Sequence, residues 1–429
     1  MIGSVHGRAS QRIDGGSLAF VGGGAAAALS AYLLIEHSTA LAAALCALPL
    51  LAWLLGRVTL ILVLLGASIP LIGTLTGGAG FNLAPSDLLL LLAGAAVFFQ
   101  AVATDSLPGF GALRTVRGPV LQYSVFMVLL LSAHFGVADF LKTGQRFELF
   151  LLPLVVGAFA AATDRHLSLL KAYVIAATAV AVVWPLDHGL GQKNPVGQMI
   201  ANALLLLVAV RGLRRYAPLA LILVPGLLLT GSRGAVLASL IGLVLIVAFQ
   251  TGRARGVTPR VLLVAVCGIA VFFVLPTALQ TRLTTLAPGE GSASAYSIKI
   301  RQQFSAAAKV VIHEHPWVGV GVGDYRAPGA PPGSPPQDPH NVLLLQAAEG
   351  GYGFELSFMI LVAGIALALY RTRAAELAAA AAAILLSTVA HGFVDVYWAR
   401  ATPVLGWTLV GMACAMASKA RNAVEEAQA

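Results

Sequence analysis

The chain has 429 residues, of which 58% are hydrophobic and only 10% are charged, whereas an ordinary soluble domain has about 25% charged residues. Because so few charges could not cover the surface of a soluble fold, the composition predicts a polytopic membrane protein. It excludes a collagen, a disordered chain and a secreted disulfide scaffold. Cys46, Cys267 and Cys414 lie in apolar runs, and an odd number of such thiols argues against a disulfide framework.

Apolar runs of membrane-spanning length recur along the chain and predict an all-α fold with about 12–14 transmembrane helices in contact with membrane lipids. The candidate spans are 17–35, 38–56, 58–77, 84–104, 117–136, 147–163, 167–187, 195–210, 217–230, 234–250, 261–278, 353–370, 374–391 and 402–418. The first 16 residues show no clean signal-peptide pattern, so we expect no cleavage.

The Lys and Arg residues between these runs predict the orientation, because cytoplasmic loops carry the excess of positive charge. Most of them fall on one side, which places both termini in the cytoplasm. The short outer loops are left with Lys142, Arg146, Lys193, Arg233 and Arg400. The net charge of +9 is therefore read as a topology signal and not as a nucleic-acid surface.

The spans and loops divide the chain into four parts. Residues 1–192 form N-terminal transmembrane helices, and residues 193–278 form further transmembrane helices. Residues 279–340 contain no span and are predicted to form a long loop outside the membrane. Residues 341–429 form the last transmembrane helices and a cytoplasmic tail. Long loops among tight connections are frequent places for function.

Four helices that run inward from the outer face combine a capping residue with a cation or a histidine at their starts. These starts are Lys193-Asn194-Pro195, Ser232-Arg233, Asp338-Pro339-His340-Asn341 and Arg400-Ala401-Thr402-Pro403. Asn can cap a helix and Pro suits its first position. Because helix N-termini and Arg side chains attract phosphate, several such ends at one depth predict a phosphate or pyrophosphate site. Alternatively, each cation is an interfacial anchor. The glycines beside Arg233 favour a functional role, since they allow close approach of a ligand.

The loop contains its own candidates. Residues 297–312 have helical spacing and predict an amphipathic helix on the outer membrane surface. Its apolar stripe is Ile300, Phe304, Ala308 and Val311. Arg301, on another side, is either a ligand-binding residue or a snorkelling surface charge. Pro316 ends this helix, and the following Gly319-Val320-Gly321-Val322-Gly323 predicts a tight turn.

His340 is the strongest candidate for catalysis, because histidine is the natural proton acceptor near neutral pH. Its alternative role is to satisfy a helix end. A zinc site with His313, His315 and His340 matches no standard ligand spacing, and no metal is predicted. The rival pair His391 and Asp395 shares one helix face, where an interfacial hydrogen bond is the simpler interpretation. Glu349 follows His340 by nine residues, so the two meet only if the glycines at 350, 351 and 353 break the helix.

Together these segments resemble the O-antigen ligase and O-antigen polymerase superfamily of bacterial membrane glycosyltransferases. The matching pieces are Lys193-Asn194-Pro195, Thr230-Gly231-Ser232-Arg233-Gly234-Ala235, Arg301, Pro316-Trp317-Val318-Gly319-Val320-Gly321-Val322-Gly323, His340-Asn341 through Glu349-Gly350-Gly351, and His391-Gly392-Phe393-Val394-Asp395. Their order, and the long loop before the last spans, make the resemblance specific.

The resemblance implies an enzyme of the inner membrane that acts on the periplasmic face. Its donor would be a glycan on undecaprenyl pyrophosphate, and its acceptor lipid A–core. It implies no metal, no other cofactor and no nucleic-acid partner. Arg233 and Arg301 would hold the pyrophosphate, and His340 would be the base. The helix starts described above add Lys193, Asn194 and Arg400 to the predicted donor site. Ser232, Glu349, His391 and Asp395 would support the site.

Three alternatives stay open. An O-antigen polymerase uses the same donor but a lipid-linked glycan as acceptor. A protein O-oligosaccharyltransferase uses a periplasmic polypeptide. A lipid-linked oligosaccharide flippase is disfavoured, because a transporter needs charged residues along a midplane cavity, whereas the polar candidates here gather at the outer face.

Overall fold

The computed structural model describes residues 53–72, 84–187, 192–249, 293–326, 328, 338–398 and 401–428. Every regular element within these residues is a helix, as the sequence predicts. Five of the described helices are long and apolar enough to cross a membrane: Pro85–Thr104, Asp139–Ala162, His166–Val183, Arg211–Leu229 and Val342–Arg371. The chain is therefore an all-α polytopic membrane protein. The predicted spans 17–35 and 261–278, most of 38–56 and the predicted site residue Arg400 lie outside the described residues.

The chain forms two compact units, Met1–Ile61 and Leu62–Ala429. In the described part of the first unit, the Arg57 guanidinium lies over the Trp53 ring, 4.5 Å from its centroid. Helix α3 (Val58–Ser68) crosses the boundary between the units. The second unit contains α4 (Pro85–Thr104), η1 (Phe110–Thr115), α5 (Arg117–Ala133), α6 (Val137–Ala162), α7 (His166–Val183), α8 (Lys193–Ala209), η3 (Arg211–Leu219), α9 (Ala220–Leu229), α10 (Arg233–Phe249), α13 (Ala293–Glu314), α14 (Val342–Arg371), α15 (Ala378–Gly392) and α16 (Val404–Gln428).

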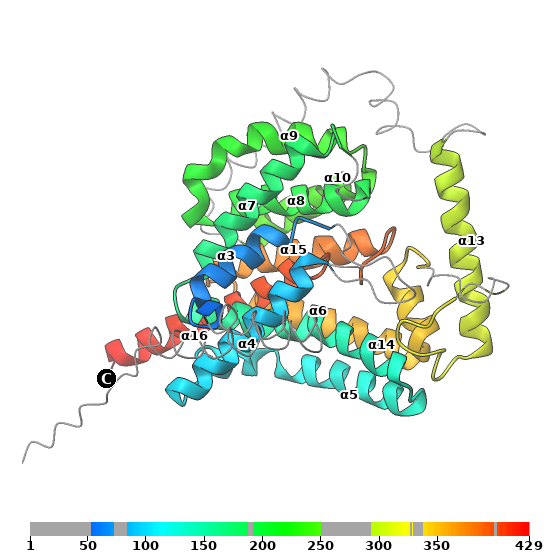
Figure 1. The fold of residues 1–429 in the computed structure, drawn as a ribbon, viewed down its shortest axis with the longest axis horizontal. Coiled ribbons are helices and arrows are strands. Elements are labelled where there is room, and N and C mark those ends of the chain that lie inside the picture. Colours follow the sequence, from blue (N-terminus) through cyan, green and yellow to red (C-terminus); the bar gives the residue numbers. More distant parts are fainter. Residues whose placement is uncertain are drawn as a thin grey trace, which may run out of the picture. The chain divides into compact units, whose positions relative to one another are not determined.

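The helices of the second unit pack in two groups that α15 joins. Helix α8 contacts α7, α9 and α10, and helix α6 contacts α4, α5 and α16. Helix α15 contacts members of both groups, namely α8, α10, α14 and α16 (Figure 1). Helix α13 packs against α14. The fold thus brings the starts of α8, α10 and α14, which are far apart in sequence, against a common neighbour.

The closest helix crossing joins α6 to α16 through two glycines. A Cβ atom on Gly157 would lie 2.0 Å from the Thr408 carbonyl oxygen, and one on Gly411 would lie 2.0 Å from the Leu154 oxygen. No side chain fits at either position. Close backbone approach through small residues is a common way in which membrane helices associate, and it anchors α6 firmly.

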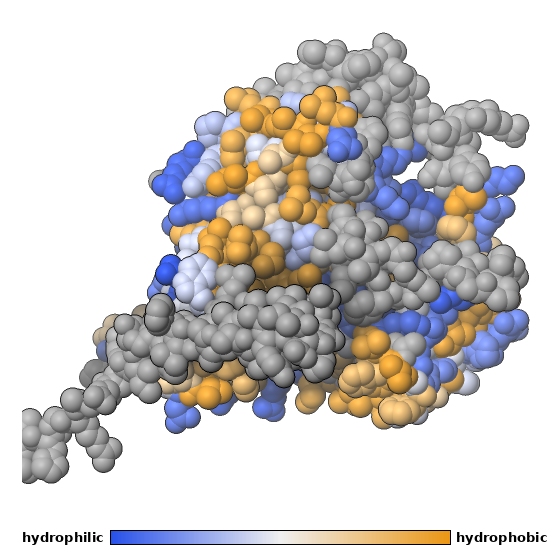
Figure 2. All heavy atoms as spheres, viewed as in Figure 1, coloured by the Kyte–Doolittle hydropathy of each residue, from blue (hydrophilic) through white to orange (hydrophobic). Residues whose placement is uncertain are grey.

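The surface of the second unit carries many exposed apolar side chains on its outer helices. Examples are Leu88 and Phe98 on α4, Leu121 and Val128 on α5, and Leu221 on α9. Figure 2 shows such apolar side chains over the region of α9 and on the lower right of the view, where α5 lies. Exposed apolar surface of this extent is expected of helices that face lipid.

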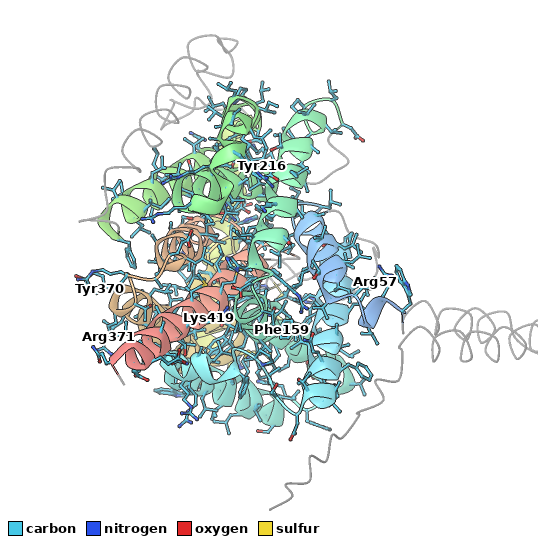
Figure 3. The ribbon with its side chains drawn as sticks, turned by 90° about the vertical axis from the view of Figure 1, so that its left-hand side faces the viewer. Arg57, Phe159, Tyr216, Tyr370, Arg371 and Lys419 are labelled. Atoms are coloured by element: carbon cyan, nitrogen blue, oxygen red, sulfur yellow. The ribbon has the colours of Figure 1, made fainter. Side chains whose placement is uncertain are left out.

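Basic side chains lie at the helix ends that are remote from α13. Figure 3 labels Tyr216, Arg371 and Lys419 on the side that faces the viewer, which is the left-hand side of Figure 1, whereas α13 stands at the right of Figure 1. Lys419 Nζ lies 2.8 Å from Asp164 Oδ1 and joins α16 to the end of α6.

The prediction of Lys142 and Arg146 in a short outer loop is wrong. Helix α6 begins at Val137, ten residues before the predicted span 147–163. The charges moved the predicted boundary because they interrupt the apolar run. In the structure their charges are paired within the protein, Lys142 with Asp324 and Arg146 with Glu349, and the helix therefore continues through them.

Candidate active site

Asp395, between α15 and α16, is the centre of a polar cluster drawn from distant parts of the chain. One carboxylate oxygen, Oδ1, lies 3.4 Å from His340 Nδ1. The other, Oδ2, lies 3.5 Å from Arg301 NH2 and 4.0 Å from His391 Nε2, and it also accepts a hydrogen bond from the Asn194 amide. The Asp395 side chain is only 4% exposed. A single buried carboxylate therefore joins α8, α13, α14 and α15.

His340 lies just before α14 in an unusual backbone conformation. Its φ is +52°, in a region that costs an ordinary residue about 1–2 kcal/mol. The backbone N–H donates to Asp338 Oδ1 at 2.6 Å, and the imidazole stacks on Phe304 with the ring planes 15° apart. The side chain is 23% exposed. A proton on Nδ1, which faces Asp395, leaves Nε2 as the basic nitrogen.

Asn341 caps α14 and fixes the position of His340 beside the helix end. Its Oδ1 accepts from the backbone N–H groups of Leu343 at 3.0 Å and Leu344 at 3.2 Å. These bonds satisfy two of the free donors of the first turn. His340 itself precedes the cap, so its side chain has no part in closing the helix.

The two carboxyl groups beside His340 have opposite pKa shifts. Burial raises the pKa of Asp338 to about 7, although His340 and its backbone N–H act in the opposite direction. Burial also acts to raise the pKa of Asp395, but the neighbouring His340 imidazole, the charge of His391, the Val396 N–H and Arg301 together hold this pKa below its ordinary value. Asp395 is therefore the anionic partner of His340 near neutral pH.

The start of α10 lies directly against this cluster. Ser232 caps it, since Ser232 Oγ accepts from Ala235 N at 3.3 Å. Arg233 is the first residue of the helix. A Cβ atom on the next residue, Gly234, would lie 2.7 Å from His391 Nε2, so only glycine allows α10 to come this close. Arg233 is thereby held next to the His391–Asp395 end of α15.

The prediction that Asn194 caps α8 is wrong. The cap position belongs to Gln192, Lys193 is the first helical residue, and Asn194 is the second. From that position the Asn194 amide donates to Asp395 and not to the backbone of its own first turn. The reason is the nearby buried carboxylate, which is a stronger acceptor and needs donors.

Glu349 does not contact His340 in the structure but belongs to a second cluster around Arg146. Arg146 NH2 donates to Glu349 Oε2 at 2.8 Å and to Oε1 at 3.1 Å. The guanidinium carbon lies 4.7 Å from the centroid of the Trp398 ring. Gln346 completes the cluster. With its amide oriented so that both ends meet partners, the oxygen accepts from Trp398 Nε1 at 2.8 Å and from Arg146 NH1 at 3.0 Å, and the nitrogen donates to Tyr123 OH at 2.9 Å. All groups of this buried cluster are matched.

The glycine strap, residues 316–323, occupies a break in α14. The backbone leaves the helical conformation at Gly350 and Gly351. Backbone hydrogen bonds join the strap to the break: Val320 N to Ala348 O at 3.0 Å, Gly321 N to Glu349 O at 2.9 Å, and Tyr352 N to Pro316 O at 2.9 Å. The strap thus satisfies carbonyl groups that an interrupted helix would leave unpaired.

The glycines of strap and helix are required by this contact. Gly319 and Gly351 both have positive φ, +59° and +72°. A Cβ atom on Gly319 would lie 2.3 Å from the Glu349 carbonyl carbon, and one on Gly351 would lie 2.4 Å from the Trp317 carbonyl carbon. Gly323 N also donates to Glu349 Oε1 at 2.8 Å. The segment predicted as a tight turn therefore packs, backbone against backbone, on the break in α14. We call this contact the interlock.

Helix α13 differs from the expected surface helix. Its apolar stripe does not remain free for lipid, because Ala308, Val311 and Ile312 are buried together with Leu345 and Ala348 of α14. The hydrophobic pattern alone could not distinguish a lipid surface from a protein surface. This packing brings Arg301, 32% exposed, to the Asp395 cluster.

A comparison with protein-family models supplies an independent observation on the segment that holds the glycine strap, His340 and Glu349. Residues 218–352 match the O-antigen ligase family. The match confirms the resemblance and supports the O-antigen ligase superfamily. Arg233 and Arg301 also lie within the matched residues, whereas Asn194, His391 and Asp395 lie outside them. A search of curated proteins finds no match.

The residues that sequence analysis missed are those whose role depends on a distant partner. Arg146, Gln346 and Trp398 were not among the predicted site residues, and only Gln346 lies within the residues that match the O-antigen ligase family. Arg146 did leave a signal, because a charge inside an apolar segment is expensive and is usually kept for a reason. Its pairing with Glu349, 203 positions away, is visible only in the fold.

Proposed function

We propose that the chain is an O-antigen ligase. It transfers a glycan from undecaprenyl pyrophosphate to a sugar of lipid A–core at the periplasmic face of the bacterial inner membrane, with both termini in the cytoplasm. The observation that carries the proposal is the contact of His340 with Asp395, 3.4 Å apart, with Arg301 on the other oxygen of the same carboxylate. The match of residues 218–352 supports the same class of enzyme.

His340 is the general base in this proposal. Its Nε2 accepts the proton of the acceptor hydroxyl while the hydroxyl oxygen forms a bond to the anomeric carbon of the donor glycan. Asp395 holds the imidazole through Nδ1 and stabilises the imidazolium that forms. The oxygen attacks from the face opposite the leaving group, so the configuration at the anomeric carbon is inverted.

Undecaprenyl pyrophosphate leaves with the electron pair of the broken carbon–oxygen bond, and negative charge builds on its phosphate oxygens. Arg233 and Arg301 provide guanidinium groups beside the starts of α8 and α10. Lys193 and Arg400 add further positive charge in the proposed donor site, and Ser232 shapes the start of α10. Groups that interact more strongly with the developing charge than with the ground state accelerate the step.

The deciding experiment supplies the purified protein with lipid-linked glycan and one acceptor at a time, and identifies the product by mass spectrometry. Transfer to lipid A–core supports the ligase. Extension of a second lipid-linked glycan indicates an O-antigen polymerase, and transfer to a polypeptide indicates a protein O-oligosaccharyltransferase. Movement of the donor across a vesicle membrane without any transfer indicates a flippase and overturns the proposal.

The side of the membrane is tested separately by labelling single cysteines, in a background that lacks the three native ones. Lys309→Cys on α13 and Arg214→Cys in η3 are both at exposed positions. An impermeant reagent should label the first and not the second in cells with a permeabilised outer membrane. The reverse pattern would place the site in the cytoplasm.

A further inference from the structure

Three separate segments carry the proposed catalytic groups, and none of them holds the others by covalent connection. His340 precedes α14, Arg301 lies on α13, and Asp395 lies between the end of α15 at Gly392 and the beginning of α16 at Val404. The contacts among these groups are 3.4–3.5 Å long, too long to be the main restraint on their arrangement. Some other part of the fold must fix the three segments.

We propose that Arg146 is a positioning residue of the active site, whose guanidinium fixes the three segments that carry His340, Arg301 and Asp395. This inference rests on the proposed function. Arg146 lies on α6, outside the residues that match the O-antigen ligase family, and it acts through other residues without contact with substrate.

The first segment is fixed through the beginning of α14. Arg146 grips Glu349 with two hydrogen bonds and Gln346 with a third. Both residues belong to the part of α14 that precedes the break at Gly350 and Gly351. This short half-helix has His340 at its other end. Without the hydrogen bonds from Arg146, the half-helix could tilt at the break.

The second segment is fixed through the glycine strap. Gly323 N donates to the same Glu349 oxygen that Arg146 binds, at 2.8 Å. The strap follows α13 directly, and α13 is packed on α14 through Ala308 and Val311. The orientation of α13, and with it the position of Arg301, therefore depends on the carboxylate that Arg146 holds.

The third segment is fixed through Trp398, three residues after Asp395. The Arg146 guanidinium lies over the indole ring, and the indole Nε1 donates to Gln346, which Arg146 also contacts. A planar guanidinium with five donors can bind two acceptors and stack on an aromatic face at once. A Lys ammonium can replace the charge but not this combination.

The position of α6 makes it a suitable reference for the site. Its later residues cross α16 at the Gly157 and Gly411 contacts, where the backbones touch. A side chain that projects from a helix anchored in this way can transmit a fixed geometry to segments outside the bilayer. The rate of a transfer reaction depends strongly on the placement of its catalytic groups, since a shift of about 1 Å can lower the rate roughly 10²-fold.

The alternative is that the Arg146–Glu349 pair serves stability alone. The two roles can be separated, because replacement of both partners of a buried ion pair by apolar residues of similar size often preserves stability. The variants are Arg146→Gln, Arg146→Lys and the double variant Arg146→Met with Glu349→Leu. Lys419→Gln is the control, because its ion pair with Asp164 lies at the other end of α6, away from the strap and from α14.

The first measurement is single-turnover transfer with saturating lipid-linked glycan, together with the thermal unfolding midpoint. Arg146→Gln should lose about 10²-fold in rate, and Arg146→Lys should unfold near the wild-type midpoint and still transfer about tenfold more slowly. The double variant should recover the midpoint but not the rate. A wild-type rate in Arg146→Lys, or recovery of both properties in the double variant, would show that Arg146 is only structural.

The second measurement does not depend on the reaction. Spin labels at Lys309 on α13 and Phe393 after α15, both exposed, report the distance between two of the segments by pulsed EPR. Arg146→Gln should broaden the distance distribution, whereas Lys419→Gln should leave it unchanged. An unchanged distribution in Arg146→Gln overturns the inference even if the wild type transfers no glycan, and absence of transfer by the wild type contradicts the proposed function alone.

Discussion

The two polar clusters of this protein differ in how completely their groups are matched. Around Arg146 the bonds are 2.8–3.1 Å long and the charged partners are buried. Around Asp395 the contacts to His340, Arg301 and His391 are 3.4–4.0 Å long, and His340 and Arg301 remain partly exposed. A cluster whose donors and acceptors all have partners keeps a rigid geometry. Donors and acceptors without close partners can instead form hydrogen bonds with a substrate. The comparison fits the proposed roles, in which the first cluster positions the site and the second carries out the transfer.

The largest expected effect comes from removal of the base in the second cluster. His340→Ala should lower the single-turnover rate with saturating donor by about 10²–10⁴-fold, the usual contribution of general base catalysis. Affinity for the donor should stay near normal, because the role concerns the proton and not the phosphate. The protein should still insert and fold.

His391→Ala is the internal control for that prediction, since His391 faces the same carboxylate at 4.0 Å but is buried against Gly234. Its effect should be milder. If His340→Ala retains near-normal turnover while His391→Ala abolishes it, the proton acceptor lies at the end of α15 and the assignment of His340 is wrong.

The second largest effect concerns the arginines. Arg233→Ala and Arg301→Ala should each weaken binding of a lipid-pyrophosphate analogue and slow transfer. Loss of a charge-assisted contact costs about 1.5–3 kcal/mol, which corresponds to roughly 10- to 150-fold. Lys should rescue only in part, because it lacks the bidentate fork. Unchanged affinity and rate in both alanine variants would exclude a pyrophosphate site at these residues.

The third prediction concerns the glycine strap, which packs against α14 beside the Arg146 cluster. Gly319→Ala places a methyl group against the Glu349 carbonyl, 2.3 Å away, at a positive φ. Overpacking of this kind costs about 1–3 kcal/mol, so the unfolding midpoint should fall. Gly118→Ala on α5, where a Cβ atom would meet nothing within 4 Å, is the matched control and should be neutral or slightly stabilising. Equal midpoints for the two variants would contradict the interlock.

The fourth prediction is a change in the pH dependence of stability. The Asp338 pKa is about 7 in the folded protein, against about 3.9 in an unfolded chain. The folded state therefore holds an extra proton between these values, and stability should fall as pH rises from about 4 to about 7. Asp338→Asn keeps an oxygen that can accept from His340 N and should flatten this part of the stability curve. A curve with the wild-type slope would show that another group titrates there.

Much of the fold follows from the sequence because apolar runs dictate membrane helices. The runs at 84–104, 117–136 and 167–187 correspond closely to α4, α5 and α7. The sequence places the start of α6 too late, because Lys142 and Arg146 interrupt the apolar run before the predicted span 147–163. A hydropathy pattern registers the cost of Arg146 in an apolar segment but not the Glu349 carboxylate that offsets it.

The candidate site could be predicted only as separate pieces. His340 was marked by its position at a helix start, and Asp395 by its spacing from His391. The meeting of His340 with Asp395, and the turn of Asn194 toward that carboxylate, depend on how α8, α14 and α15 pack. Those contacts join residues far apart in the chain, and one sequence holds no local trace of them.

The break in α14 divides this helix into a short part and a part of membrane-spanning length. The whole helix has 30 residues, or about 45 Å, whereas the hydrocarbon core of a bilayer is about 30 Å thick. The part after the break, residues 352–371, is about 30 Å long and matches that core. If that part spans the hydrocarbon, the part before the break, residues 342–349, extends about 12 Å beyond it. A donor with its isoprenoid tail in the bilayer and its pyrophosphate in the headgroup layer would bring its first sugar to this level without leaving the membrane.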